Sequence, residues 1–215
     1  MQYIDNILFV IVLAAGLAFF AKNVKKLIRN IKLGKKVDRS DNTSARWANM
    51  TRIALGQGKM VRRPVAGILH IIVYLGFIII NIEVLEIVVD GIAGTHRAFS
   101  GMGAFYGFLI ASFEILAVLV LVSVIIFWIR RNVIKLQRFV KDEMKGWPKS
   151  DGNWILYFEI ILMSLFLIMN ATDVPFQEMN SGNVISSHLA GFFNGMAPET
   201  LHVIERGAWW LHIVG

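Results

Sequence analysis

The sequence predicts an all-α integral membrane protein: a bundle of five transmembrane helices, the fifth truncated, with the N-terminus outside and the basic loops in the cytoplasm. Three observations predict this class. Hydrophobic residues make up 56% of the 215 residues, and the mean hydropathy of +0.59 is too high for an ordinary soluble domain. Apolar stretches of transmembrane length recur along the chain. Of the 22 Lys and Arg residues, 13 lie in residues 22–63 and seven in residues 130–150, which is a strong positive-inside bias.

The first span is expected over residues 3–21. Its only charge is Asp5, and no basic segment precedes the apolar run, so it is predicted to be an uncleaved span and not a signal peptide. The cytoplasmic loop 22–63 then begins with residues 23–36, which are predicted to continue the first helix at the level of the lipid headgroups. A plain stop-transfer and topology signal is the alternative for this basic stretch.

Within the same loop, residues 45–55 are predicted to form a short amphipathic helix. Residues 41–44 offer side chains typical of a helix N-cap, and Trp47 is of the type that anchors a helix at a membrane interface. A cytosolic partner could dock on this loop, and a solvated basic surface is the alternative.

The second span is expected over residues 65–89. His70, Tyr74, Phe77 and Asn81 recur in it at helical spacing, so that one stripe of an apolar helix carries polar groups. Such groups usually face a bundle interior, a partner or a cofactor, because exposing them to lipid is costly. In its last turns, Glu83 and Glu86 either extend outward to the interface or lie beside a proton path.

The third span, residues 104–129, contains Glu114 about ten residues from its outer end. We expect this carboxyl group at mid-depth, where it must be protonated, paired, or part of a proton or quinone site. The basic loop 130–150 leads to the fourth span, residues 153–170.

The external loop 171–198 contains no basic residue, and its apolar residues would let it lie on the membrane and cap the bundle. A fifth span is expected over residues 200–215, with His202, Glu205 and His212 on one broad face. Sixteen residues rise only about 24 Å, short of a full crossing. We therefore expect the sequence to stop inside its last helix.

The histidines are the candidate cofactor ligands, because the absence of cysteine excludes thiolate sites and iron–sulfur clusters held by this chain alone. His70 lies about 9 Å from the inner edge of the second span, and His212 about 18 Å from the outer edge of the fifth. Their depths then differ by only a few ångström, which allows one haem b with two axial imidazoles. The alternative for each histidine is a hydrogen-bonded packing residue.

Two segments carry a resemblance to the membrane cytochrome b family of respiratory nitrate reductase gamma subunits and heterodisulfide reductase membrane subunits. They are Leu69-His70-Ile71 and the run Trp209-Trp210-Leu211-His212-Ile213-Val214-Gly215. Residues 60–86 and 127–135 more closely resemble the N-terminal membrane half of bacterial heterodisulfide-reductase-type iron–sulfur oxidoreductases. The resemblance covers essentially the whole chain.

This resemblance implies haem b bound by histidines of the second and fifth spans, and electron transfer between a quinone pool and a cytosolic iron–sulfur partner. It also implies a cytosolic domain with two [4Fe–4S] clusters beyond residue 215. The chain departs from the nitrate reductase gamma pattern, because Ile80 stands where a second ligand of the second span would be expected. At most one haem is therefore supported, with His70 paired either to His212 or to a histidine past Gly215.

The resulting hypothesis is the membrane part of a quinone-linked oxidoreductase in the bacterial inner membrane. His70 and His212 would be the haem ligands, and Glu114, Glu83 and Glu205 the candidates for handling protons or quinone. The rival hypothesis is a non-redox membrane anchor, or a small ion or proton transporter that uses the intramembrane glutamates. The placement of the basic residues indicates orientation and contact with anionic lipid, and it offers no case for nucleic-acid binding.

Overall fold

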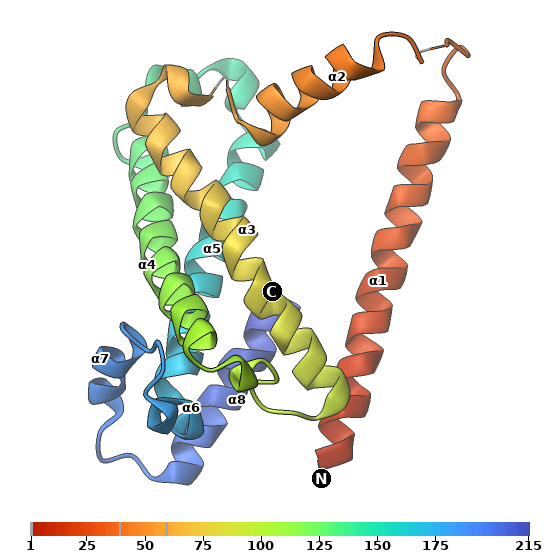
Figure 1. The fold of residues 1–215 in the computed structure, drawn as a ribbon. Helices are drawn as coiled ribbons and strands as arrows, with labels where there is room; N and C mark the ends of the chain where they lie inside the picture. Colours follow the sequence, from red (N-terminus) through yellow and green to blue (C-terminus); the bar gives the residue numbers. More distant parts are fainter. Residues whose placement is uncertain (1, 39, 59) are drawn as a thin grey trace. The chain divides into compact units, whose positions relative to one another are not determined.

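The computed structural model describes residues 2–38, 40–58 and 60–215, and these residues form helices, turns and loops with no strand among them. The all-α prediction is therefore confirmed for the described part of the chain (Figure 1). The helices are α1 Gln2–Lys32, α2 Thr43–Met50, α3 Pro64–Ala93, α4 Ala104–Asn132, α5 Trp147–Thr172, α6 Val174–Met179, α7 Ser186–Ala190 and α8 Pro198–Val214.

Four helices in the described residues are long and apolar enough to cross a membrane: Ile4–Lys32 of α1, α3, α4 and α5. Each contains one of the first four predicted spans, which is consistent with a multi-pass membrane protein. Helix α8 has 17 residues and rises about 26 Å. It is not among the four membrane-length helices, so the fifth span stays a prediction.

Glycine and proline set the helix ends that hydropathy alone misplaced. Helix α3 begins with Pro64, whose missing N–H costs nothing in the first turn, and it ends at Gly94 with φ 72°. Helix α5 begins at Trp147, six residues before the predicted span, because Gly146 turns the chain with φ 70° and Pro148 fits the first turn. The last residues of the predicted loop 130–150 therefore belong to the helix.

The loop between α1 and α3 differs in detail from its prediction. Helix α1 continues the first span as expected but ends at Lys32, and α2 begins at Thr43. Asn42 takes a left-handed conformation, with φ 49°, and its side chain makes no capping hydrogen bond. The expected side-chain N-cap is therefore wrong at Asn42. After α2 the chain continues as one π-helical turn, Thr51–Leu55. In this turn the Gly56 N–H donates to the carbonyl five residues earlier, that of Thr51, at 2.7 Å.

The chain divides into two compact units, the first made of residues 1–64 and 85–98, and the second of residues 65–84 and 99–215. In the first unit, the Asn6 side chain donates to the Gly91 carbonyl at 2.8 Å. The ring of Phe9, only 2% exposed, packs directly on Gly91, where any side chain would collide with it. The start of α1 is therefore fitted to the end of α3.

In the second unit, α4 and α5 are antiparallel and tied at two levels. The amides of Asn132 and Asn153 exchange two hydrogen bonds, of 3.1 and 3.0 Å. Near the other end, Asn170 donates to Glu114 at 3.2 Å. Helix α5 also packs along α8 (Figure 1). We call the two levels the Asn132 end and the α7 end of this unit.

The polar stripe predicted on α3 does not share one environment. His70 and Tyr74 are half-buried, whereas Phe77 is 66% exposed and Asn81 is exposed. The Asn81 amide donates to the Phe77 carbonyl of its own helix, which satisfies it without a partner helix. Phe77 and Asn81 are thus exposed in this chain, and the expectation that the stripe faces a partner or a cofactor stays a prediction.

Candidate functional site

Glu114 is fully buried on α4, with 0% exposure, and its carboxylate accepts three N–H hydrogen bonds. Oε1 accepts the Asn170 amide at 3.2 Å. Oε2 accepts the backbone N–H of Ile185 at 2.7 Å and of Ser186 at 3.0 Å. Glu114 thus satisfies the first backbone donors of α7 in place of a local capping side chain. The pairing expected for a buried carboxylate is present.

The hydrogen bonding continues from Glu114 into the segment that follows α5. The Gln177 amide donates both to the Asn170 carbonyl, at 2.8 Å, and to the Ser186 hydroxyl, at 2.9 Å. Asn183 in turn donates to the side-chain oxygen of Gln177 at 2.9 Å. Asn170, Ser186 and Asn183 are all buried. The polar groups of this segment therefore form one network around Glu114.

Close backbone contact brings the same segment against α4. Gly182 has φ +86°, and a Cβ added there would collide with the carbonyl of Gly107. A Cβ on Gly107 would meet the Ser181 hydroxyl at 2.6 Å. Glycine is required at Gly182, where the contact is with backbone, and this approach places the chain before α7 beside the first turns of α4.

Glu114 lies close to the end of α5. Asn170, its hydrogen-bond partner, lies two residues before the end of α5 at Thr172. The first ten residues of α4, about 15 Å of helix, therefore lie beyond the level of Asn170. The mid-depth position of this carboxyl group in a bilayer stays a prediction.

His212 is held by a backbone group of α5. Its Nδ1 lies 3.1 Å from the Leu162 carbonyl oxygen. Because a carbonyl only accepts, Nδ1 must carry the hydrogen, and in a neutral ring Nε2 then keeps its lone pair. This is the arrangement that orients most metal-ligating histidines. The half-buried imidazole also lies beside Phe166, with ring centroids 6.2 Å apart.

The depth of His70 can be compared with that of His212 inside the second unit. Gly76 of α3 packs directly on Val120, six residues from Glu114 along α4. His70 lies six residues further from the α7 end, at about 18 Å from the Glu114 level.

The carbonyl of Leu162 accepts the hydrogen bond from His212. Leu162 lies eight residues before Asn170 on α5, which is about 12 Å along the helix from the level of Glu114. The two imidazoles thus differ in depth by about 6 Å, roughly one helical turn. This offset is larger than the few ångström expected from span lengths.

The other two predicted glutamates lie close to the level of Glu114. Glu83 is seven residues beyond Gly76 on α3, and Glu205 is seven residues before His212 on α8. The same rise per residue puts both within about 2 Å of the Glu114 level. Both are buried, and Oε2 of Glu205 lies 3.6 Å from Nδ1 of the exposed His202. Three helices therefore carry a buried carboxyl group at one depth.

Sequence reasoning missed the partners of these groups. The Leu162 carbonyl has no signal in the sequence, and Gln177 and Ser186 lie in a segment expected to lie on the membrane surface. Asn170 shares a helical stripe with the polar Glu159, which was its one visible signal. The other two histidines, His96 and His188, are exposed. No group of three or more His, Asp or Glu residues placed to hold a metal ion occurs among the described residues.

In the described residues, fold and site together give four membrane-length helices, buried carboxyl groups on three helices and an oriented imidazole. The chain is 27% identical over 216 residues, 98% of its length, to the probable iron-sulfur-binding oxidoreductase FadF of Bacillus subtilis (strain 168). It is 23% identical over 192 residues, 83% of its length, to EtfAB:quinone oxidoreductase of Syntrophomonas wolfei subsp. wolfei (strain DSM 2245B / Goettingen).

The chain spans 29% of the first relative and 25% of the second, less than a third of either protein. Both relatives are consistent with the resemblance to iron–sulfur oxidoreductases, at low identity. Neither name mentions a cytochrome b. No protein-family model and no solved structure matches the chain.

Proposed function

We propose that this chain is a membrane electron-transfer module that relays electrons between a quinone pool and a cytosolic iron–sulfur partner or domain. The names of the two relatives support the chemistry, because one binds iron–sulfur and the other is a quinone oxidoreductase. The four membrane-length helices support a location in the bilayer, where quinone dissolves. His70 and His212 would hold haem b, which would supply the one-electron relay.

The contact between His212 and the Leu162 carbonyl carries this proposal. It favours one tautomer and orients the ring through a backbone acceptor, which does not depend on a second side chain. His70 belongs to the same compact unit and is likewise half-buried. These residues fit a group that needs two imidazoles among apolar and aromatic side chains. Bound haem b would supply a reversible one-electron centre.

The carboxyl layer at the α7 end is proposed to handle the protons that accompany quinone chemistry. Glu83, Glu114 and Glu205 are buried at one depth on three helices. A carboxyl group in such surroundings can hold or release a proton beside a bound quinone. In this arrangement the basic loops face the cytoplasm, the α7 end faces outward, and the membrane is the bacterial inner membrane.

Reduced-minus-oxidised absorption spectra of the protein, purified from cells with ample haem supply, test the proposal. The expected result is a haem b band that is lost in His70→Ala and in His212→Ala and kept in His188→Ala, whose ring is exposed. Absence of the band from the parent protein would refute the haem relay. A band that persists in His212→Ala would remove His212 as a ligand and leave His70 paired with another residue.

The buried carboxyl layer also favours a second function, an ion or proton transporter or a non-redox anchor. A transporter predicts a colourless protein in which Glu83→Gln or Glu205→Gln abolishes ion flux into liposomes. The electron-transfer proposal predicts that the same variants slow quinone-linked turnover while the haem spectrum is unchanged.

A further inference from the structure

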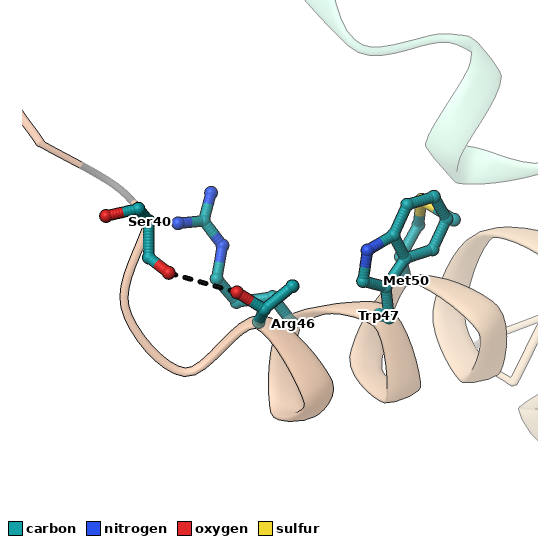
Figure 2. A pocket seen from close by; sticks show the side chains of 5 residues that line it. Ser40, Arg46, Trp47 and Met50 are labelled. Carbon is teal, nitrogen blue, oxygen red and sulfur yellow. Dashed lines mark hydrogen bonds between the residues drawn. The ribbon is translucent and has the colours of Figure 1, made fainter.

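Helix α2 presents an apolar face that lies open in the structure. Trp47 is 62% exposed and Met50 is 42% exposed, and they lie three residues apart on one side of the helix. With Ser40, Thr43 and Arg46 they line an open hollow of about 490 Å³ (Figure 2). A tryptophan and a methionine exposed together favour an environment that is apolar on one side and wet on the other.

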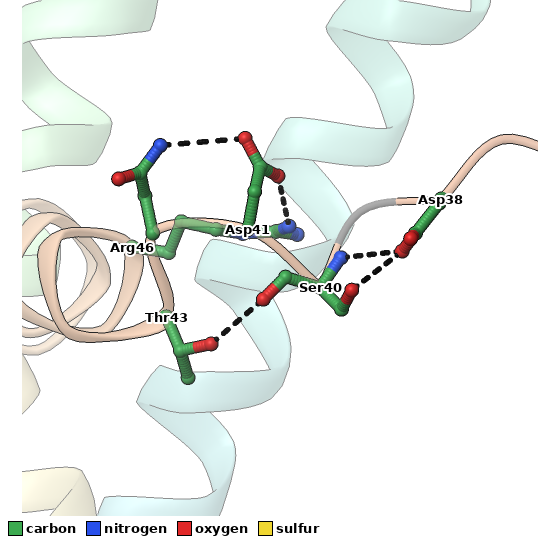
Figure 3. A network of polar contacts seen from close by, with 6 residues as sticks. Asp38, Ser40, Asp41, Thr43 and Arg46 are labelled. Atoms are coloured by element: carbon green, nitrogen blue, oxygen red, sulfur yellow. Dashed lines mark hydrogen bonds and ion pairs between the residues drawn. The ribbon is translucent and has the colours of Figure 1, made fainter.

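The turn before α2 keeps the acidic side chains of this segment in local contacts (Figure 3). The Asp38 carboxylate accepts the Ser40 hydroxyl at 2.6 Å and the Ser40 N–H at 2.9 Å. Asp41 lies 3.8 Å from Arg46, and the Thr43 hydroxyl donates to the Ser40 carbonyl at 3.0 Å. These contacts fix the direction in which α2 leaves the turn.

The charge of the surrounding loop is strongly positive. Residues 22–63 contain 13 Lys or Arg against two Asp, and both aspartates belong to the turn just described. Within α2, Arg46 lies beside Trp47 along the hollow, whereas Arg52, two residues after Met50, lies on the opposite side of the helix. A basic helix with an apolar face is typical of segments that lie in the plane of a membrane interface.

The loop also begins and ends at a membrane-length helix. Helix α1 ends at Lys32 and α3 begins at Pro64, and both are apolar enough to cross a bilayer. The segment that carries α2 is therefore attached at both ends to the same membrane surface. Anionic headgroups at that surface complement its charge.

We propose that α2, with the turn Thr51–Leu55, is an interfacial anchor that inserts Trp47 and Met50 among the lipids of an anionic leaflet. Arg46 contacts the phosphates at the edge of this face. The inserted face reaches the boundary between headgroups and acyl chains, about 5–10 Å deep. This anchor is independent of the proposed redox function.

Spin labels test this proposal directly, because the chain contains no cysteine and each introduced cysteine is unique. Met50→Cys places a nitroxide on the apolar face, and Ala45→Cys places one on the opposite, exposed side of the same helix. The full chain is reconstituted in nanodiscs of phosphatidylglycerol with phosphatidylethanolamine, and in nanodiscs of phosphatidylcholine. Collision with oxygen and with a water-soluble nickel chelate is then measured by electron paramagnetic resonance.

In the anionic discs we expect the Met50 label to favour oxygen several-fold over nickel relative to the Ala45 label. In phosphatidylcholine, or with Trp47→Gln added, nickel access to the Met50 label should rise several-fold. Equal nickel access at both labels in anionic discs would overturn the proposal. So would protection of the Met50 label that requires an added cytosolic protein, because the face would then dock a protein. The mobility of the Ala45 label checks that the helix is intact in every sample.

Discussion

Oε2 of Glu114 accepts the backbone N–H of Ile185 at 2.7 Å, although 71 residues separate the two in the sequence. The cap of a short helix is normally supplied by a residue next to it in the chain. Here the cap is a carboxylate of a membrane-length helix. The consequence is that the segment between α5 and α8 is fixed to α4 by a long-range contact.

Removing the Glu114 carboxylate should release this segment. Glu114→Ala leaves two backbone N–H groups and the Asn170 amide buried without their acceptor, a loss of roughly 2–4 kcal/mol. Hydrogen exchange at Ile185 and Ser186, followed by mass spectrometry in detergent, should accelerate sharply. Glu178→Gln, on the exposed surface of α6, is the matched control and should leave exchange unchanged. Equal protection in Glu114→Ala and the parent would show that packing alone holds the segment.

The contact between Gly182 and Gly107 makes a second prediction. Gly182→Ala places a methyl group against the Gly107 carbonyl and forces a side chain into φ +86°. The backbone conformation alone costs roughly 1–3 kcal/mol. The thermal midpoint of the purified protein should fall by several degrees. Gly191→Ala, where a Cβ would meet nothing within 4 Å, should change stability by at most about 1 kcal/mol. Similar losses in both variants would contradict this account.

A double-mutant cycle tests the amide pair that ties α4 to α5. The Asn132 and Asn153 side chains exchange two hydrogen bonds, so each single alanine variant leaves a partner unsatisfied. The double variant removes both, and we expect a coupling free energy of roughly 0.5–1.5 kcal/mol in chemical unfolding. The control cycle combines the alanine variants of Asn153 and Asn23, an exposed residue of α1. In that cycle the two changes in the free energy of unfolding should be additive.

The long helices could be predicted from the sequence. A segment that crosses a bilayer must make its backbone hydrogen bonds within its own helix, and its side chains must be apolar, so it appears as a continuous apolar stretch. Their ends were less predictable. Gly146 and Pro148 start α5 six residues early, and only their conformations reveal it. The amphipathic helix around Trp47 was predicted, whereas its capping was not, because Asn42 uses its left-handed conformation in place of its side chain.

The site was predictable only as residue types. A buried glutamate and an intramembrane histidine stand out as costly in an apolar helix. Their partners do not stand out. Every residue has a backbone carbonyl, so nothing in the sequence marks that of Leu162 as a partner of His212. Ile185 and Ser186 lie 71 and 72 residues from Glu114 in the sequence.

The turn before α2 should respond to pH through Asp38. The hydrogen bonds from the Ser40 side chain and then from its backbone N–H hold the pKa of this carboxyl group below its ordinary value. A carboxyl group whose pKa is lowered by folding stabilises the turn at pH values above its unfolded pKa, about 3.9. That contribution is lost as the pH falls through the lower, folded pKa. The Ser40 amide should therefore lose its protection from hydrogen exchange as the pH falls below the unfolded pKa and through the lower, folded pKa. Asp38→Asn should show low protection throughout, whereas Asp151→Asn, in α5, should keep the parent profile. If the protection of the Ser40 amide from hydrogen exchange did not change with pH, Asp38 would not be the residue that holds the turn.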